Sequence, residues 1–231
     1  MGHIRKLNTT ANMMKKSATT YIAAIAGAGA IAAGFVWSAM ADQAPEASPE
    51  NAGRLETAIF AGGCFWCTEA DFDKVDGVVA TISGYTGGDV DDPSYKQVTG
   101  GNTGHYESVK ISYDPQTVSY EELVAHYFRT VDPTDPDGQF CDKGSSYRTA
   151  IFVANDDERG IVEDKIDEIA ESGVLDEPIV TKVLDASEFW PAEDRHQNYH
   201  RTNSVKYSFY RQGCRRDERL EKIWGDQAAI N

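Results

Sequence analysis

The strongest constraint on how this chain folds is the run Ala61-Gly62-Gly63-Cys64-Phe65-Trp66-Cys67. It follows a short apolar stretch over residues 55–61, a pattern typical of a buried strand. Two consecutive glycines permit the sharp backbone turn that a strand needs in order to pass directly into a helix. The sequence therefore predicts a strand that ends at these glycines and a helix that begins at Cys64.

A second thiol, Cys67, lies three residues after Cys64 in that predicted helix. Backbone N–H groups and the helix dipole favour a thiolate at a helix N-terminus, so we expect the pKa of Cys64 to be lowered. The Cys-x-x-Cys spacing also lets both sulfur atoms meet at the first turn, as in dithiol redox sites. The chain has no second pair of this kind, which argues against a structural zinc site and predicts that no metal is bound.

Hydrophobic periodicity predicts that strands and helices alternate along the folded part. Strands are predicted over 55–61, 78–85, 106–113, 148–154 and 179–184, and helices over 64–76, 120–130 and 156–172. Ser119 and Glu122 have the spacing of a capping box for the second helix. Two Gly- and Asp-rich stretches, 86–104 and 132–146, are predicted to be long loops around the Cys64 turn.

This order of elements predicts an α+β fold, a two-layer sandwich with a mixed sheet and a ferredoxin-like βαββαβ core. The segment from residue 192 onward is rich in Tyr, Arg and His, and we expect it to be irregular or helical. One folded domain over residues 55–226 accommodates all of these elements.

The first 41 residues have the pattern of an export signal. Cationic residues precede the apolar stretch 21–37, and Ala39-Met40-Ala41 fits a cleavage site with small residues. An uncleaved membrane anchor is the alternative, because the apolar stretch approaches the roughly 17 residues needed to cross a bilayer. Either interpretation predicts an exported, periplasmic domain, joined to the leader by a polar linker over 42–54.

Charge and cysteine content narrow the functional classes. The formal net charge is −15, and such an acidic chain repels phosphate backbones and anionic lipid headgroups, which argues against nucleic acid as a partner. Four cysteines are too few and too scattered for a disulfide-stapled scaffold in a chain of 231 residues. We therefore expect the thiols to carry redox chemistry.

Five motifs follow one another in the order typical of one enzyme family. They are Gly63-Cys64-Phe65-Trp66, Gly84-Tyr85-Thr86-Gly87-Gly88, Ser94-Tyr95-Lys96-Gln97-Val98, Gly101-Asn102-Thr103-Gly104-His105-Tyr106-Glu107 and Gly144-Ser145-Ser146-Tyr147-Arg148-Thr149-Ala150-Ile151-Phe152. Through them the chain resembles the A-type peptide methionine sulfoxide reductases over residues 57–225. The resemblance implies reduction of methionine-S-sulfoxide, free or in oxidised proteins, by a monomer that binds no cofactor and draws electrons from a thioredoxin-type thiol reductant.

Reduction of a sulfoxide requires a nucleophile at sulfur and a proton for the departing oxygen. The predicted nucleophile is the thiolate of Cys64, and the predicted acid is Glu107, kept protonated in a partly desolvated aromatic pocket. The hydroxyls of Tyr95 and Tyr147 can hydrogen-bond the sulfoxide oxygen as charge develops on it. On an alternating strand Glu107 could equally be an acid facing solvent, and the tyrosines could be ordinary core or surface aromatics.

Phe65 and Trp66 are predicted to form an apolar wall for the methyl group of the substrate. The resemblance places Asp142 near the same pocket, where it would orient the substrate. These three residues complete the candidate substrate-binding set.

Attack on the sulfoxide leaves Cys64 as a sulfenic acid, which a second thiol must resolve to a disulfide. Cys67 is nearest in the sequence, and it replaces a glycine of many resembling proteins. Cys214 lies in a C-terminal segment that folds back toward the first cysteine in those proteins. We expect either Cys67 or Cys214 to be the resolving residue, and Cys141 to be a packing or bystander thiol.

Other functions remain open at this point. A thioredoxin-like disulfide oxidoreductase would also use Cys64 and Cys67, although no proline precedes a strand where that class carries a cis-proline. A non-enzymatic thiol sensor is a further alternative. His196 and His200 have helical i, i+4 spacing for a metal, but without a third ligand we expect a surface helix instead.

Overall fold

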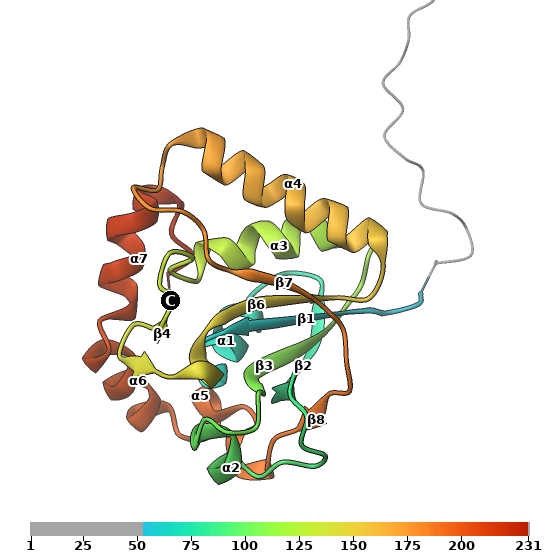
Figure 1. The fold of residues 1–231 in the computed structure, drawn as a ribbon, viewed down its shortest axis with the longest axis vertical. Coiled ribbons are helices and arrows are strands. Elements are labelled where there is room, and N and C mark those ends of the chain that lie inside the picture. The colour runs from blue at the N-terminus through green and yellow to red at the C-terminus, as the bar shows by residue number, and fades with distance from the viewer. Residues whose placement is uncertain (1–52, 231) are drawn as a thin grey trace, which may run out of the picture. The chain divides into compact units, whose positions relative to one another are not determined.

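The computed structural model describes residues 53–230, so the predicted leader and most of the predicted linker lie outside the described residues. Strand β1 (Glu56–Gly62) is at the centre of the sheet and pairs antiparallel with β3 (Tyr106–Tyr113) and β6 (Thr149–Val153). Strand β2 (Val78–Thr86) pairs antiparallel with β3 on the far side. The resulting order β6-β1-β3-β2 is that of the predicted ferredoxin-like core (Figure 1).

Two further strands extend the sheet to six. Strand β7 (Lys182–Asp185) adds in parallel to β6, and β8 (Trp190–Pro191) pairs antiparallel with β2 at the opposite edge. The prediction of an α+β fold with a mixed sheet is therefore confirmed. Strand β7 starts three residues later than predicted, and β8 was not predicted because two residues carry no periodicity.

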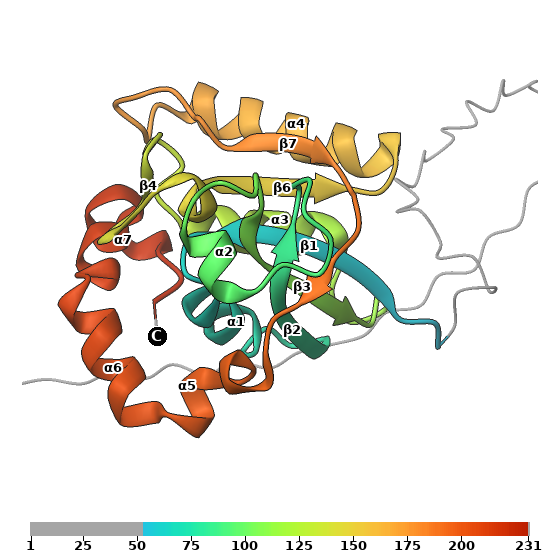
Figure 2. The same ribbon diagram turned by 60° about the horizontal axis from the view of Figure 1, so that its bottom comes forward.

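Three helices follow the strands of the core, namely α1 (Phe65–Phe72), α3 (Tyr120–Arg129) and α4 (Asp156–Ser172). Together with β6 and β7, α4 forms the upper part of the molecule in Figure 2. Phe60 of β1 connects the two layers, since its ring lies 5.1 Å from those of both Phe72 and Tyr127. The main hydrophobic core is this interface between sheet and helices.

The helix termini follow local rules. The predicted capping box is present: Ser119 Oγ accepts a hydrogen bond from the Glu122 N–H at 3.2 Å, and Glu122 Oε2 accepts one from the Ser119 N–H at 2.8 Å. Helix α4 has the predicted bounds, with Asn155 as its N-cap and Gly173 in the left-handed conformation at its end. Helix α1 ends at Phe72, earlier than predicted.

The two stretches predicted as loops contain short regular elements. Helix α2 (Tyr95–Thr99) interrupts the first stretch. In the second, β4 (Gly138–Gln139) and β5 (Asp142–Lys143) form a small hairpin, followed by a 3-10 turn over Ser145–Tyr147. The prediction of uninterrupted loops was wrong because glycine and aspartate mark turns but do not exclude a single helical turn or a two-residue ladder.

The C-terminal segment is mainly helical rather than irregular. It consists of α5 (Tyr199–Thr202), α6 (Ser204–Gly213) and α7 (Arg216–Trp224), preceded and followed by 3-10 turns. These helices wrap around the end of the sheet where α1 begins (Figure 2). None of the helices within residues 53–230 combines the length and apolar character required to cross a bilayer.

Buried ion pairs join this segment to α1. The Arg211 guanidinium donates to Asp71 Oδ1 at 2.9 Å, and the Arg216 guanidinium donates to Asp71 Oδ2 at 3.4 Å. Arg216 also donates to the Thr130 carbonyl at 2.7 Å and to the Gly62 carbonyl at 3.3 Å. Both guanidinium groups are nearly inaccessible to water, so these contacts set the position of the C-terminal helices against α1.

Candidate active site

The turn between β1 and α1 is built as the sequence predicts. Gly63 has φ +86, a conformation that favours glycine, and a Cβ at this position would lie 2.5 Å from the Cβ of Gln139. Cys64 is the N-cap of α1, and its carbonyl accepts hydrogen bonds from the N–H groups of Cys67 at 3.0 Å and Thr68 at 3.2 Å. The helix therefore begins at Phe65, one residue after the predicted start, with the predicted cysteine as its cap. Only glycine at position 63 allows the chain to turn so close to the hairpin.

The thiols of Cys64 and Cys67 are both free, buried and hydrogen-bonded to each other. Burial raises the pKa of Cys64, and the neighbouring Cys67 and Glu107 raise it further. The prediction of a lowered pKa at Cys64 was therefore wrong, because desolvation outweighs the helix terminus. The hydrogen bond from Cys64 instead lowers the pKa of Cys67, with help from the buried charges of Arg216 and Arg211.

Glu107 lies beside this thiol pair and does not face solvent. Its position on β3 opposite Tyr85 directs it to the helical side of the sheet, where Oε2 accepts a hydrogen bond from the Phe65 N–H at 3.1 Å. The side chain is 1% exposed, and within the described residues Oε1 has no hydrogen-bond partner. Burial raises the pKa of Glu107 to about 8, although the hydrogen bond from Phe65 opposes the shift. The carboxyl group therefore holds a proton at neutral pH.

Tyr95 and Tyr147 lie next to the carboxyl group. Tyr95 opens α2 and Tyr147 closes the 3-10 turn after the hairpin, and their hydroxyls are hydrogen-bonded to each other. Tyr147 is also hydrogen-bonded to Glu107. Burial raises the pKa of Tyr95 to about 12, so its hydroxyl stays protonated and able to donate. The structure thus brings these three predicted residues together.

Aromatic rings surround Phe65 and Trp66. The Phe65 ring is buried, with the His196 ring centroid at 5.2 Å and that of Tyr95 at 6.3 Å. Trp66 is half-buried, stacks on Tyr199 at 3.8 Å and donates from Nε1 to His196 Nδ1 at 3.2 Å. An apolar wall therefore lines one side of the site, as predicted.

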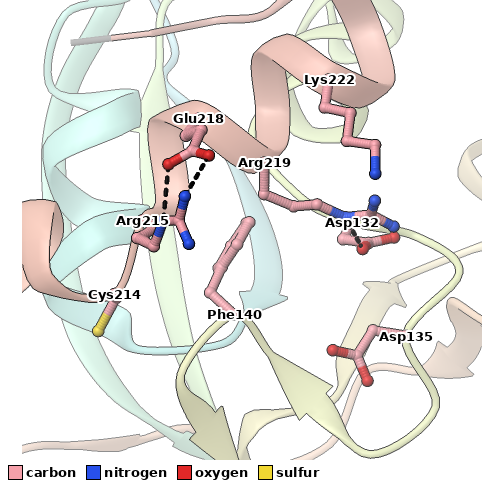
Figure 3. Close-up of a pocket in the computed structure, with 8 residues that line it drawn as sticks. All are labelled: Asp132, Asp135, Phe140, Cys214, Arg215, Glu218, Arg219 and Lys222. Atoms are coloured by element: carbon pink, nitrogen blue, oxygen red, sulfur yellow. Dashed lines mark hydrogen bonds and ion pairs between the residues drawn. The ribbon is translucent and has the colours of Figure 1, made fainter.

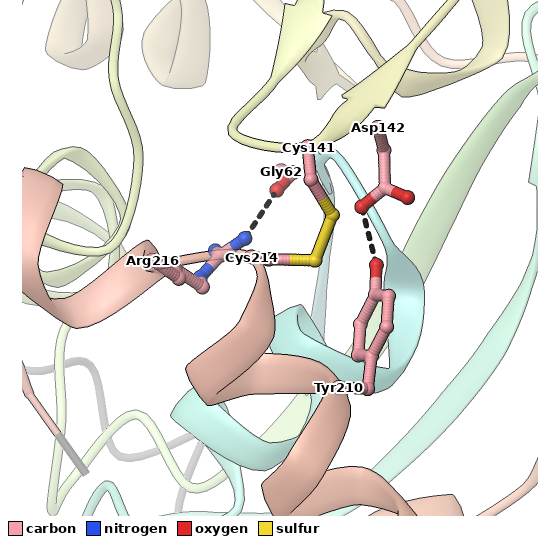
Figure 4. The surroundings of a disulfide bond; sticks show 6 residues. All are labelled: Gly62, Cys141, Asp142, Tyr210, Cys214 and Arg216. Carbon is pink, nitrogen blue, oxygen red and sulfur yellow. Dashed lines mark hydrogen bonds between the residues drawn. A yellow bond between two sulfur atoms is a disulfide. The ribbon is translucent and has the colours of Figure 1, made fainter.

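Asp142 and Cys141 both belong to the small hairpin. Asp142 Oδ2 accepts a hydrogen bond from the Tyr210 hydroxyl, while Cys141 forms a disulfide with Cys214 at the end of α6 (Figure 4). The interpretation of Cys141 as a packing or bystander thiol was wrong, because a loop and a helix 73 residues apart in sequence bring the two sulfurs together. Burial raises the pKa of Asp142. When Asp142 is ionised, its negative charge raises the pKa of Glu107.

On the other side of Cys214 lies a surface cavity of about 320 Å³. Four of its charged lining residues form two ion pairs, Arg215 with Glu218 and Arg219 with Asp132 (Figure 3). Phe140 also lines it. The cavity is separate from the thiol pair, but it places Cys214 within reach of solvent.

Two predicted residues have other roles than expected. His196 ends a 3-10 turn and is buried, whereas His200 belongs to α5, where its Nε2 lies 3.2 Å from Asp73 Oδ2. The prediction of one exposed helix carrying both histidines was therefore wrong. Within residues 53–230 the two do not belong to a group of side chains able to hold a metal.

Sequence reasoning missed several residues of the site, namely Tyr85, Glu193, His196, Tyr199 and Tyr210. Glu193 accepts hydrogen bonds from the Tyr85 hydroxyl at 2.9 Å and from the Tyr95 N–H at 3.1 Å, and so connects the C-terminal segment to α2. Tyr85 stands in one of the five motifs given above, whereas the only signal for the other four was the concentration of Tyr, Arg and His after residue 192. It gave no indication of which side chains turn inward.

Comparison with known proteins gives a consistent assignment. Residues 56–228 match the family model described as peptide methionine sulfoxide reductase. The chain is 51% identical over 180 residues to peptide methionine sulfoxide reductase MsrA 2 of Rhizobium meliloti, a match that covers 78% of this chain and 89% of that protein. It is also similar to a solved structure of methionine sulfoxide reductase A of Corynebacterium diphtheriae, with a TM-score of 0.59, 35% identity and coverage of 65% and 76% of the two chains.

A third relative is longer. The chain is 44% identical over 185 residues to peptide methionine sulfoxide reductase MsrA/MsrB of Vibrio cholerae, a match that covers 80% of this chain and 49% of that protein. The chain thus spans about half the length of this relative, whose name joins two activities.

We predict that the carboxyl group of Glu107 titrates near pH 8, because burial outweighs its hydrogen bonds. Replacing Tyr147 by Phe removes a hydrogen bond that stabilises the carboxylate, and should raise this pKa further. Carbon-13 NMR of glutamate side-chain carboxyls across pH 4 to 10 measures both values. Titration of Glu107 in the range of a glutamate fully exposed to water would contradict the prediction.

Proposed function

Because the chain belongs to the peptide methionine sulfoxide reductases, we propose that it reduces methionine-S-sulfoxide, free or in oxidised proteins, at the thiol of Cys64. The observation that carries the proposal is the buried, protonated carboxyl group of Glu107 at the first turn of α1. A nucleophilic sulfur and a proton donor therefore meet in one desolvated pocket. Sulfoxide reduction needs both groups.

In the first step the Cys64 thiolate attacks the sulfur of the sulfoxide. This attack forms an S–S bond, and the sulfoxide oxygen takes the proton of Glu107. The hydroxyl group then moves from the methionine sulfur to the Cys64 sulfur, so that the S–O bond of the substrate and the new S–S bond both break, leaving a sulfenic acid at Cys64 and free methionine. The tyrosine pair, Tyr95 and Tyr147, donates hydrogen bonds to the oxygen as its negative charge grows. A raised pKa suits Glu107 to this role, because an ionised carboxylate could not donate the proton.

The ionisation of Cys64 and the ionisation of Glu107 depend on each other in this pocket. A negative charge on Glu107 raises the pKa of Cys64, and by reciprocity a thiolate at Cys64 keeps the proton on Glu107. The state with a thiolate and a neutral carboxyl group has the same net charge as the state with a thiol and a carboxylate. At neutral pH the thiol and the carboxyl group are both protonated, so the reactive form requires the loss of one proton from the pocket and adds a single buried charge.

The apolar wall formed by Phe65 and Trp66 binds the methyl group of the substrate. Trp66 is held between the Tyr199 ring and the His196 imidazole, so its position does not depend on the substrate. A rigid wall of this kind favours a methyl sulfoxide over a polar thiol. Asp142 at the opposite rim orients the rest of the substrate.

Cys67 resolves the sulfenic acid. Its thiol is already hydrogen-bonded to Cys64, and the charges of Arg216 and Arg211 lower its pKa. Attack of the Cys67 thiolate on the Cys64 sulfenic acid forms the S–S bond and releases the oxygen as water. Cys214, the other candidate, is bonded to Cys141 in the structure. A thioredoxin-type dithiol then reduces the Cys64–Cys67 disulfide and is itself oxidised to a disulfide.

Replacing Cys64 by Ser should abolish reduction of methyl p-tolyl sulfoxide, since a serine hydroxyl is not ionised at neutral pH. Replacing Glu107 by Gln should lower the rate by about 10²- to 10⁴-fold, the usual contribution of a general acid. In the unmodified protein the rate should rise as the pH approaches about 8, where the pocket loses its first proton, and fall only at higher pH, where Cys64 and Glu107 are both ionised. Steady-state assays with dithiothreitol measure all three effects.

The matched control is Glu121→Gln, which removes an exposed carboxyl group on α3 and should leave the rate unchanged. Full turnover by the Cys64→Ser protein would overturn the proposal. Reduction of insulin disulfides without reduction of sulfoxide would instead favour a disulfide oxidoreductase.

One equivalent of methionine-S-sulfoxide, added without reductant, should produce a Cys64–Cys67 disulfide that peptide mass spectrometry detects. In a Cys67→Ser protein the sulfenic acid should persist at Cys64 and react with dimedone. The doubly substituted protein Cys141→Ser, Cys214→Ser should still form the Cys64–Cys67 bond. A Cys64–Cys214 bond in the unmodified protein would show that Cys214 is the resolving residue.

We place the enzyme in the periplasm, where it would repair oxidised envelope proteins. The support is the cationic and apolar leader with its Ala39-Met40-Ala41 segment. Expression of the full chain in a Gram-negative host, followed by fractionation and N-terminal sequencing, should yield periplasmic protein that starts at Asp42. Full-length protein in the periplasmic membrane fraction would indicate the uncleaved anchor, and cytosolic protein would contradict export.

A further inference from the structure

Tyr210 is the one C-terminal side chain that contacts the reactive sulfur, the aromatic wall and the hairpin together. Its hydroxyl donates to Asp142 and is close enough to the thiol of Cys64 to lower the pKa of that thiol. Its ring meets the Trp66 ring edge-on, with centroids 5.8 Å apart. The mechanism above assigns no role to this residue.

A disulfide and a hydrogen bond, which lie next to each other, hold Tyr210 in that position. Cys141 and Asp142 are adjacent on the hairpin, while Tyr210 and Cys214 are one helical turn apart at the end of α6. The disulfide joins the outer member of each pair, and the hydrogen bond joins the inner member (Figure 4). Cys141 is exposed, so a thiol reductant can reach this disulfide, whereas Tyr210 is half-buried behind it.

We propose that Tyr210 is a further catalytic residue whose hydroxyl turns from Asp142 to the sulfur of Cys64 when that sulfur is ionised, and that the Cys141–Cys214 disulfide is a redox clasp that keeps it within reach. The inference rests on the proposed function. The contacts that support it, however, are those around the Cys64 thiol and involve no substrate. Opening the clasp releases the end of α6 from the hairpin. Tyr210 then loses its alignment with both Asp142 and Cys64.

The hydroxyl acts by stabilising negative charge on sulfur. Burial opposes that charge, and so do two groups that face the Cys64 sulfur, Cys67 from α1 and Glu107 from β3. The hydrogen bond from Tyr210 on α6 lowers the pKa of Cys64 against them. The oxidised clasp therefore corresponds to the more reactive enzyme.

Opening the clasp requires two electrons and two protons. A dithiol supplies both: its sulfurs attack the Cys141–Cys214 bond in turn, the two cysteines leave as thiols, and the dithiol becomes a disulfide. No sulfoxide is consumed in this step. The same class of reductant that regenerates the Cys64–Cys67 pair can therefore act on the clasp.

The test is the pH dependence of alkylation of Cys64 by iodoacetamide, read by tandem mass spectrometry that assigns the label to Cys64. The protein is prepared with the clasp closed and the Cys64–Cys67 pair reduced. Replacing Tyr210 by Phe keeps the ring and removes the hydroxyl, and should raise the midpoint by about one pH unit. The single-turnover rate of sulfoxide reduction at pH 7 should fall by about tenfold in parallel.

The doubly substituted protein Cys141→Ser, Cys214→Ser should shift the midpoint in the same direction. Adding Tyr210→Phe to it should cause no further shift, because the hydroxyl has already lost its position. The unmodified protein with its clasp opened by limited dithiothreitol gives the same comparison without any substitution. Tyr120→Phe is the control, since the Tyr120 hydroxyl is buried without a hydrogen-bond partner among the described residues.

An unchanged midpoint in the Tyr210→Phe protein would overturn the role of Tyr210. Independent, additive shifts from the two sets of substitutions would overturn the clasp. Loss of steady-state turnover with an unchanged first turnover in the Cys141→Ser, Cys214→Ser protein would also overturn it, because these cysteines would then relay electrons. If the unmodified protein reduced no sulfoxide, the proposed function would fail, while the alkylation midpoints would still decide the inference.

Discussion

Exclusion of water from the space between β1, β3 and α1 governs the chemistry of this protein. Three acidic groups share that space: the thiols of Cys64 and Cys67 and the carboxyl group of Glu107. A desolvated pocket does not accommodate three negative charges, so their ionisation states depend on one another. Buried guanidinium groups favour charge at Cys67, while Glu107 keeps its proton.

The fold produces this arrangement with few elements. The central strand β1 ends in the glycine turn, and β3 beside it carries Glu107 toward the same end of the sheet. The hairpin fills the space above the turn, where Gln139 lies so close that residue 63 must be glycine. Gln139 also accepts a hydrogen bond from the Asp132 N–H at 2.9 Å, which secures the hairpin to the end of α3. A change at the turn would therefore reach Tyr147 and Asp142 as well as the thiols.

The parts of the structure that were predictable from sequence are those encoded locally. The glycine turn, the Ser119–Glu122 capping box and the bounds of α4 depend on residues a few positions apart. The hairpin, the Cys141–Cys214 bond and the contacts of Tyr210 depend on segments far apart in the chain, for which one sequence contains no signal. The pKa of Cys64 was predicted with the wrong sign for the same reason, since burial by distant segments outweighs the local helix terminus.

The last strand of the sheet has a consequence for contacts with other chains. Oxidised, partly unfolded polypeptides expose extended segments that can add to an open sheet edge. Beyond β2 that edge is occupied by β8, only two residues long, and Pro191 within it has no N–H to offer. An extended segment of another chain therefore finds no continuous row of free backbone groups to pair with at this edge. Aggregation by strand addition is therefore disfavoured at this edge of the sheet.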